Sequence, residues 1–456
     1  MAAKLFSLFF IACTCAAAQQ PRQLPQADDR YKADILLVVA HPDDEGAATP
    51  YLARAIDEGK RVAVVYTTRG SSGANEVGSE QAGALGEIRE IEARRANAFL
   101  GITNVWFLNG KDTASQNVLQ SLANWGHGES LQELVRLVRL TRPEVILTFL
   151  PGTFVGEDHG DHQAAGVLAT EAFDLAGDPT VFPEQVAGPT RRLEIFLENL
   201  RPWQTKKIYY FPDADREELF RGLGPEYPVK DISKSSKHAY WRMALDSFRW
   251  HETQAKSFID SIAHMNDAQL EKLATSDWGD AQHFVRGRSL VGGSLTGDIF
   301  DGITPDAVAF APPDRTLKSE PPTLSAELGG PWSFYDDFRR AHGLQKLPHP
   351  EPPEIALQYG TTLVIPIWLR NPLAAPQKIT LSAVLPSGWT TQSGAETLLV
   401  GPKQVASTRV EIALPPAPED GKKKELQEIT INAESEGKSI GVIKIRVELR
   451  KRALPE

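Results

Sequence analysis

Apolar runs of strand length alternate with amphipathic stretches of helical length along the first half of the chain. The runs are rich in branched side chains, and they occupy residues 34–40, 61–68, 105–108, 144–149 and 207–211. Helical patterns fall between and after them, at about 47–58, 87–100, 131–141 and 239–258. Unbroken apolar strands are typical of a sheet that is buried on both faces. The alternation therefore predicts an α/β fold, a Rossmann-like layer with a parallel sheet and right-handed crossovers.

The pattern changes after residue 310. Proline becomes frequent from Ala311 to Pro353, which predicts a connector rather than a core. Short segments of alternating apolar and polar residues follow, at 362–369, 378–384, 407–414 and 440–448. Their spacing and turn residues predict a C-terminal β-sandwich of immunoglobulin-like type over residues 354–456.

The N-terminus reads as an export signal. Lys4 precedes an apolar run from Leu5 to Ala18 that ends in small residues, which predicts a signal peptide over residues 1–18 and a linker over residues 19–33. Lipoprotein processing at Cys13 is the weaker alternative, because the apolar run before it is short. We expect a secreted or periplasmic protein, with no transmembrane segment in the mature chain.

The amino-acid composition excludes several kinds of partner and catalytic group. The chain has 456 residues, enough for two or three domains, and a formal net charge of −10 without long acidic blocks, which argues against a nucleic-acid partner. Both cysteines, Cys13 and Cys15, fall inside the predicted signal peptide. A mature chain without cysteine excludes disulfides, a thiolate nucleophile and thiolate-bound zinc, so any metal must be held by His, Asp and Glu.

Two clusters of His and Asp follow predicted strands. The segment 41–45, His-Pro-Asp-Asp-Glu, comes directly after the first strand, at the edge of an α/β sheet where ligands gather. His41 and Asp44 can converge there on one metal ion, with Asp43 between them free to face the attacking water. A second segment, 159–162, His-Gly-Asp-His, follows the fourth strand and can add a third ligand, an imidazole.

Two imidazoles and one carboxylate leave one coordination position open, which is typical of catalytic rather than structural zinc. Iron(II) is an alternative metal, because its ligand preferences are similar. The simpler interpretation is a pair of polar loops that cap helices, since Asp is favoured at helix N-termini.

Together the two clusters resemble the signatures of the PIG-L (LmbE-like) deacetylase family. The likeness covers roughly Asp34 to Gln254 and places the deacetylase domain at residues 34–310. Smaller features agree with it, namely Thr68-Arg69-Gly70, Arg89 to Glu92, Leu100-Gly101-Ile102 and His251-Glu-Thr-Gln254.

This resemblance implies a role for each site residue. Zinc would be held by His41, Asp44 and His162, and Asp43 would be the general base that acts on the attacking water. His159 would stabilise charge or aid proton transfer to the leaving amine. Asp161 would not bind the metal itself but would orient a histidine. The candidates for contacts with sugar hydroxyls are Arg69, Arg89 and Asp112, against the simpler interpretation that such arginines form surface salt bridges.

The chain departs from the family pattern at two positions. Gly160 stands where the commoner form has proline, and we expect glycine to loosen the turn without removing a ligand. Glu157 stands where some members carry a tyrosine, which leaves open what polarises the carbonyl besides zinc.

The C-terminal region has a likeness of its own. Residues 384–389, Val-Leu-Pro-Ser-Gly-Trp, and Val400-Gly-Pro resemble the NEW3-type immunoglobulin-like modules of bacterial glycan-active enzymes. Trp389 could stack on a sugar, but a tryptophan after such a turn is more often a sandwich core residue.

The leading hypothesis is an exported, zinc-dependent hydrolase that removes the acetyl group from N-acetylglucosamine-type sugars or glycoconjugates. One alternative is an amidase that acts on another sugar amide, such as a thiol conjugate. A second is a non-catalytic carbohydrate-binding protein. Neither the natural substrate nor the oligomeric state follows from the sequence.

Overall fold

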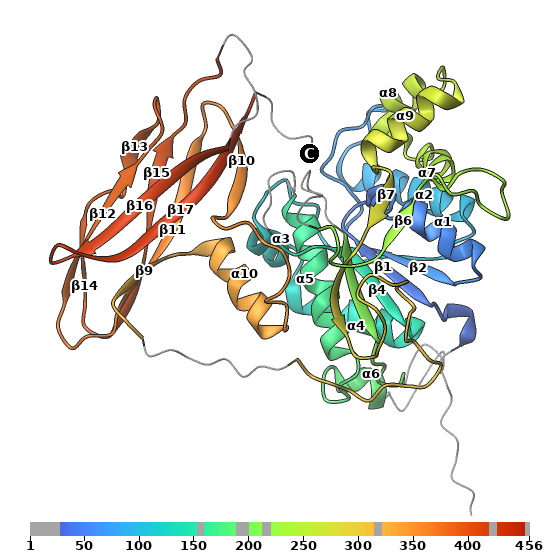
Figure 1. The fold of residues 1–456 in the computed structure, drawn as a ribbon, viewed down its shortest axis with the longest axis horizontal. Helices are drawn as coiled ribbons and strands as arrows, with labels where there is room; N and C mark the ends of the chain where they lie inside the picture. Colours follow the sequence, from blue (N-terminus) through green and yellow to red (C-terminus); the bar gives the residue numbers. More distant parts are fainter. Residues whose placement is uncertain are drawn as a thin grey trace, which may run out of the picture.

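The structure is a computed structural model that describes residues 28–152, 159–187, 200–211, 220–313, 322–418 and 426–451. An α/β domain comes first in the chain and a β-sandwich second (Figure 1). The predicted signal peptide and Glu157 lie outside the described residues. Within the described ranges, every helix is too short or too polar to span a bilayer.

A six-stranded sheet forms the centre of the α/β domain, in the order β3-β2-β1-β4-β5-β8. Its first five strands in this order are parallel, and β8 pairs antiparallel with β5. All residues of β1, β2, β4 and β5 are buried, as their unbroken apolar runs predict. The bounds are β1 (Ile35–Val39), β2 (Val62–Tyr66), β3 (Asn104–Phe107), β4 (Val145–Phe149), β5 (Lys207–Phe211) and β8 (Val285–Ser289). The predicted Rossmann-like layer is confirmed.

Helices connect these strands and cover the sheet (Figure 1). They are α1 (Thr49–Asp57), α2 (Ala82–Phe99), α3 (Val118–Asn124), α4 (His127–Thr141), α5 (Gly160–Leu175) and α6 (Pro183–Ala187). Two 3-10 helices, η1 (Asp29–Tyr31) and η2 (Asp44–Ala47), precede β1 and α1. The short α3 was not predicted; its start is capped by Asn117, whose side chain accepts a hydrogen bond from the Leu119 amide at 3.1 Å.

The single helix predicted over residues 239–258 is wrong. The chain forms α7 (Tyr240–Phe248) and α8 (Glu252–Ile262), and the backbone of His251 between them is not helical, with φ −88° and ψ 57°. The imidazole of His251 is fully buried against Glu45, so this contact is made where the two helices separate. The remaining elements are α9 (Asp267–Asp277) and a two-stranded sheet of β6 (Glu226–Pro228) and β7 (Ala281–His283).

The proline-rich segment predicted as a connector contains two regular elements, β9 (Ser325–Leu328) and α10 (Gly330–Ala341). Ala326 of β9 belongs to the core of the sandwich, whereas Tyr335 and Phe338 of α10 are buried in the core of the α/β domain. Proline is compatible with this helix because Pro331 occupies its first turn, where an amide hydrogen is not needed. Side chains of this segment therefore pack into both cores. Figure 1 shows α10 between the sandwich and the α/β domain.

The β-sandwich consists of two sheets that share one apolar core. Their strand orders are β10-β17-β16-β12-β14 and β13-β15-β11-β9, and all pairings except β10 with β17 are antiparallel. Trp389 is 7% exposed and lies in this core, so its prediction as a core residue is confirmed. The strands are β10 (Glu354–Gln358), β11 (Thr362–Asn371), β12 (Gln377–Val384), β13 (Thr390–Ser393), β14 (Thr397–Val400), β15 (Gln404–Ala413), β16 (Leu426–Ser435) and β17 (Lys438–Arg450).

Candidate active site

The two predicted clusters meet at the carboxyl ends of β1 and β4. These strands are neighbours in the sheet, and the strand order reverses between them. In an open α/β sheet this switch point is where a crevice forms for ligands. The turn after β1 holds Asp43 at φ 106°, a conformation that a non-glycine residue adopts only where its surroundings impose it.

Three side chains come together here at distances that suit one metal ion. His41, Asp44 and His162 offer ligand atoms within 4.8 Å of one another. Asp44 Oδ2 lies 3.5 Å from His41 Nδ1, and Asp44 Oδ1 lies 3.2 Å from His162 Nε2. A tetrahedral ion with bonds of about 2.0–2.2 Å separates its ligands by roughly 3.3–3.6 Å, so the donor set fits zinc.

The backbone and the core fix these side chains in place. Asp44 Oδ2 accepts hydrogen bonds from the amides of Ala40 and His41, at 3.0 and 2.6 Å. The ring of His162 stacks on Phe149 at the end of β4, with centroids 4.3 Å apart and planes within 1°. Both side chains are thus held before any ion binds.

Asp161 lies behind His41. Its Oδ2 is 3.3 Å from His41 Nε2 and accepts a hydrogen bond from the Thr113 amide at 2.9 Å, and the residue is fully buried. The opposite nitrogen of His41, Nδ1, faces Asp44. A carboxylate on the far side of an imidazole fixes the ring orientation and its tautomer.

His159 stands beside the same cluster. Its ring meets that of His41 edge to face, with centroids 4.5 Å apart, and its Nδ1 accepts a hydrogen bond from the Asp161 amide at 3.2 Å. His41, Asp112 and His159 form a second group of ligand-type atoms within 4.8 Å. The sequence offered no spacing that would connect Asp112 to these histidines.

The charges of this cluster depend on one another. Burial and the Asp44 carboxylate raise the pKa of Asp43 to about 7. Burial opposes ionisation of Asp44, but His162 and His41 outweigh it and hold the pKa of Asp44 well below its usual range. Burial also opposes a charged His41, but the Asp44 carboxylate raises the pKa of His41 well above its usual value. Burial, with the charges of His41 and His162, lowers the pKa of His159 to about 3.

Asp112 is the predicted substrate residue that lies in the cluster. Its Oδ1 is 3.4 Å from His41 Nε2, and its Oδ2 accepts a hydrogen bond from the Ser72 amide at 2.8 Å. Burial would raise the pKa of Asp112, but the contact with His41 lowers it to about 2. An ionised carboxylate at this position can accept hydrogen bonds from sugar hydroxyls.

The two predicted arginines make internal contacts. The buried guanidinium of Arg89 donates to the carbonyls of Gly70 and Ala74, the latter at 2.7 Å, and so holds the loop after β2. Arg69 donates to Glu90 at 2.9 Å and to the Leu108 carbonyl at 3.0 Å. Arg89 lies close enough to Asp43 and Asp112 to interact with their charges. The partners of Arg69 are instead residues outside the cluster.

A buried pair that the sequence did not reveal supports Asp43. Glu45 Oε1 lies 2.6 Å from His251 Nε2, and Glu45 Oε2 accepts a hydrogen bond from the Asp43 amide at 3.0 Å. Glu45 is 2% exposed and His251 is fully buried. His251 stood out in the sequence within residues 251–254, but nothing there indicated Glu45 as its partner.

Comparisons with known proteins point to one family. A model of the family described as PIG-L, GlcNAc-PI de-N-acetylase, matches residues 36–173. A 1D-myo-inositol 2-acetamido-2-deoxy-alpha-D-glucopyranoside deacetylase of Thermobifida fusca is 30% identical over 48% of this chain and 82% of its own length. The protein of the same name in Streptomyces scabiei is 32% identical over 59% and 89%.

Solved structures are more distant. N,N'-diacetylchitobiose deacetylase from Pyrococcus horikoshii is 20% identical, with a TM-score of 0.40, and the match covers 57% of this chain and 85% of that one. A conserved protein of Thermus thermophilus is 22% identical, with a TM-score of 0.35, over 58% and 100%.

Proposed function

The chain belongs to the PIG-L family of de-N-acetylases, and from this premise we propose that it removes the acetyl group from N-acetylglucosamine-type sugars with a bound zinc ion. Family membership makes it a hydrolase of C–N bonds. The observation that carries the proposal is the position of Asp43, next to His41 and Asp44 in the turn that closes on His162. A carboxylate so placed could take a proton from a water bound to a metal ion that His41, Asp44 and His162 would hold.

We assign the metal to His41, Asp44 and His162. When bound there, zinc supplies a Lewis acid that polarises the acetyl carbonyl and lowers the pKa of water at its open position. Asp161 holds the ring of His41 so that Nδ1 points into the site. Iron(II) would suit the same ligands.

Asp43 has the properties of a general base that later acts as an acid. A carboxyl whose pKa is near the working pH can take the proton of the attacking water and return it to the leaving amine. The Asp43 amide is tied to Glu45, and Glu45 in turn to His251. This buried chain keeps the base in its unusual backbone conformation.

His159 is assigned a different part in the reaction. Because its pKa is low and its Nδ1 accepts a hydrogen bond from the Asp161 amide, the neutral ring carries its proton on Nε2. A neutral imidazole of this kind can donate a hydrogen bond to the oxyanion that develops on the acetyl group. His159 therefore fills the role left open by the absence of tyrosine at position 157.

The test is acetate release from N-acetylglucosamine and short chitin oligomers by zinc-loaded protein, beside an Asp43→Asn variant whose zinc content is measured. We expect acetate from the parent and a loss of about 10²–10⁴-fold in kcat for the variant, with zinc unchanged. Equal rates would refute Asp43 as the base. No acetate from a parent that holds one zinc per chain would favour another sugar amide as substrate.

We also propose that the protein is exported. The support is the pattern of residues 1–18, with Lys4 before an apolar run and three alanines at its end. The N-terminal sequence of protein recovered from the periplasm or the medium tests this proposal. Cleavage near Ala18 is expected, and an intact Met1 on protein found only in the cytoplasm would contradict export.

A further inference from the structure

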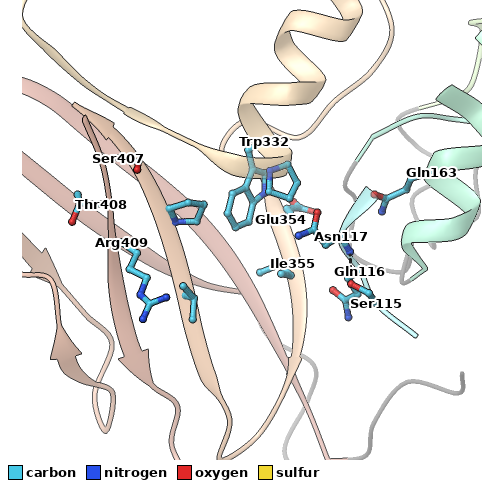
Figure 2. A pocket seen from close by; sticks show the side chains of 13 residues that line it. Ser115, Gln116, Asn117, Gln163, Trp332, Glu354, Ile355, Ser407, Thr408 and Arg409 are labelled. Carbon is cyan, nitrogen blue, oxygen red and sulfur yellow. Dashed lines mark hydrogen bonds between the residues drawn. The ribbon is translucent and has the colours of Figure 1, made fainter. Parts of the chain in front are cut away.

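A cavity lies between the β-sandwich and the α/β domain (Figure 2). Its volume is ≈730 Å³, within the roughly 300–1,000 Å³ that is usual for small-molecule sites. Its lining comes from three parts of the chain: residues 115–117 and Gln163 of the α/β domain, Trp332 of α10, and β10, β11 and β15 of the sandwich. Neither domain alone would form it.

Two short segments belong to both the cavity and the active site. Gln163, which lines the cavity, directly follows the proposed ligand His162 on α5. Residues 115–117 follow Asp112 in the same loop, and the Ser115 carbonyl accepts a hydrogen bond from the Gly160 amide at 2.6 Å. A ligand in the cavity therefore lies against the same backbone that positions the His and Asp cluster.

The cavity contains buried hydrogen-bond donors. Gln163 is 1% exposed, and its Oε1 accepts a hydrogen bond from the Tyr335 hydroxyl. Its Nε2 has no partner among the described residues, and the same holds for Nε1 of Trp332. A buried donor without an acceptor is destabilising, so a ligand that brings an oxygen atom to it gains binding energy.

The charged groups of the lining are already paired. Glu354 is buried and lies 3.5 Å from Arg446, and the exposed Arg409 lies 2.8 Å from Glu411. The other polar side chains are amides and hydroxyls, among them Asn117 and Ser407. This lining suits an uncharged polar ligand better than an anion or a cation.

Apolar surface lies beside these polar groups. Val364 and Pro366 alternate along β11 with the buried Leu363 and Ile365, so they stand on the outer face of the sheet, which turns toward the α/β domain. Figure 2 shows the indole of Trp332 in the middle of the lining, with Asn117 and Gln163 on one side and Arg409 on the other. An indole face beside amide and hydroxyl groups matches a pyranose ring, which has apolar faces and polar edges.

We propose that this cavity is a carbohydrate-binding subsite, which holds neutral sugar units of an oligosaccharide whose N-acetyl group is hydrolysed at the neighbouring site. The proposal rests on the proposed function for the reaction, but not for the binding. It makes the sandwich part of substrate recognition. Substrates of several sugar units should then be preferred to a monosaccharide.

The test compares N-acetylglucosamine with its β-1,4-linked tetramer. We expect the parent to show a kcat/KM at least about tenfold higher for the tetramer, the gain that one aromatic contact and a few hydrogen bonds provide. Trp332→Ala should reduce this ratio, mainly through KM. Ser407→Trp should also reduce it, by filling the cavity from an exposed strand position whose side chain makes no hydrogen bond with the described residues. Ser382→Trp, at an exposed position of β12 outside the lining, is the matched control and should leave the ratio unchanged.

Calorimetric titration of the same proteins with the tetramer separates the two proposals. If the parent releases acetate from both substrates with equal kcat/KM, and Ser407→Trp does not weaken tetramer binding, the subsite is refuted. The deacetylase proposal then stands. If the parent binds the tetramer but releases no acetate, and Ser407→Trp abolishes the binding, the subsite is supported and the proposed reaction is refuted. Neither binding nor acetate release overturns both.

Discussion

Nε2 of His41 lies 3.3 Å from Oδ2 of Asp161, on the side of the ring opposite to the atom that faces Asp44. Asp161 is fully buried and lies in the first turn of α5, the helix that carries His162. One carboxylate therefore connects the two segments that supply the proposed metal ligands. We argue from this that Asp161 acts on the metal through His41 and does not bind it.

Asp161→Asn tests this relation. The amide oxygen can still accept the hydrogen bond from the Thr113 amide, but the carboxylate charge that orients His41 is lost. We expect zinc affinity to fall about 10–100-fold, with the fold retained. Competition with a chromophoric chelator measures the affinity, and thermal unfolding checks the fold. An unchanged zinc affinity would show that Asp161 does not affect metal binding through His41.

His251→Ala tests the support of the base. The change removes the imidazole that lies 2.6 Å from Glu45 and so loosens the acceptor of the Asp43 amide. We expect kcat to fall while zinc content stays at one per chain, and stability to fall by about 3–5 kcal/mol because a buried partner is lost. Urea unfolding and kcat are the measurements.

Glu252→Gln, at the exposed neighbouring position, is the control for this variant and should change neither quantity. A stability loss without any change in kcat would assign the Glu45 and His251 pair to folding alone.

The strand ends that carry the candidate site could be predicted from sequence. Residues 35–40 and 145–149 are apolar except for Thr148, and such runs form buried parallel strands whose carboxyl ends share one edge. His41 and Asp44 follow one of these strands directly, so their convergence needed no knowledge of distant contacts. Periodicity and short spacing were sufficient for this part of the molecule.

The contacts of Glu45 and of α10 could not be predicted in this way. Glu45 and His251 are 206 residues apart, and a buried charged pair leaves no periodic pattern in the sequence. Residues 311–353 read as a connector because proline is frequent, yet Tyr335 and Phe338 pack into the α/β core. Composition records the mean character of a segment, whereas docking depends on the few side chains that face the neighbouring domain.

Gly160 explains one departure from the family pattern. A Cβ at this position would stand 2.8 Å from the Ser115 carbonyl oxygen and 2.9 Å from Ser121 Oγ. The Gly160 amide also donates to the Ser115 carbonyl at 2.6 Å, which a proline could not do. The close approach of residues 115–121 therefore requires glycine in this chain.

Gly160→Ala and Gly160→Pro should both destabilise the protein, and the proline variant more, because it adds a lost hydrogen bond to the steric contact. We expect about 1–3 kcal/mol for alanine, from urea unfolding. Gly128→Ala in α4 is the control: a Cβ there meets nothing within 4 Å, and alanine in a helix should stabilise by about 0.5–1 kcal/mol. A stable Gly160→Pro variant would contradict this account.

The pair of His127 and Glu171 provides a pH-dependent contribution away from the site. His127 Nε2 lies 2.6 Å from Glu171 Oε2, and this hydrogen bond raises the pKa of His127, although burial works against it. Because the folded-state pKa lies above the unfolded value of about 6.5, the stabilisation is complete at pH below about 6.5. It is lost as the pH rises through the folded-state pKa and the imidazole becomes neutral.

His127→Asn should therefore lower the unfolding temperature more at pH 6 than at pH 9. The difference in stability should remain below about 1 kcal/mol, because the side chain of His127 is 39% exposed and water screens the pair. Calorimetric scans of both proteins at the two pH values measure it, and Glu171→Gln should give the same pH dependence. A deficit in His127→Asn that is equal at both pH values, or larger at pH 9, would mean that packing at the start of α4, and not the ion pair, accounts for the effect.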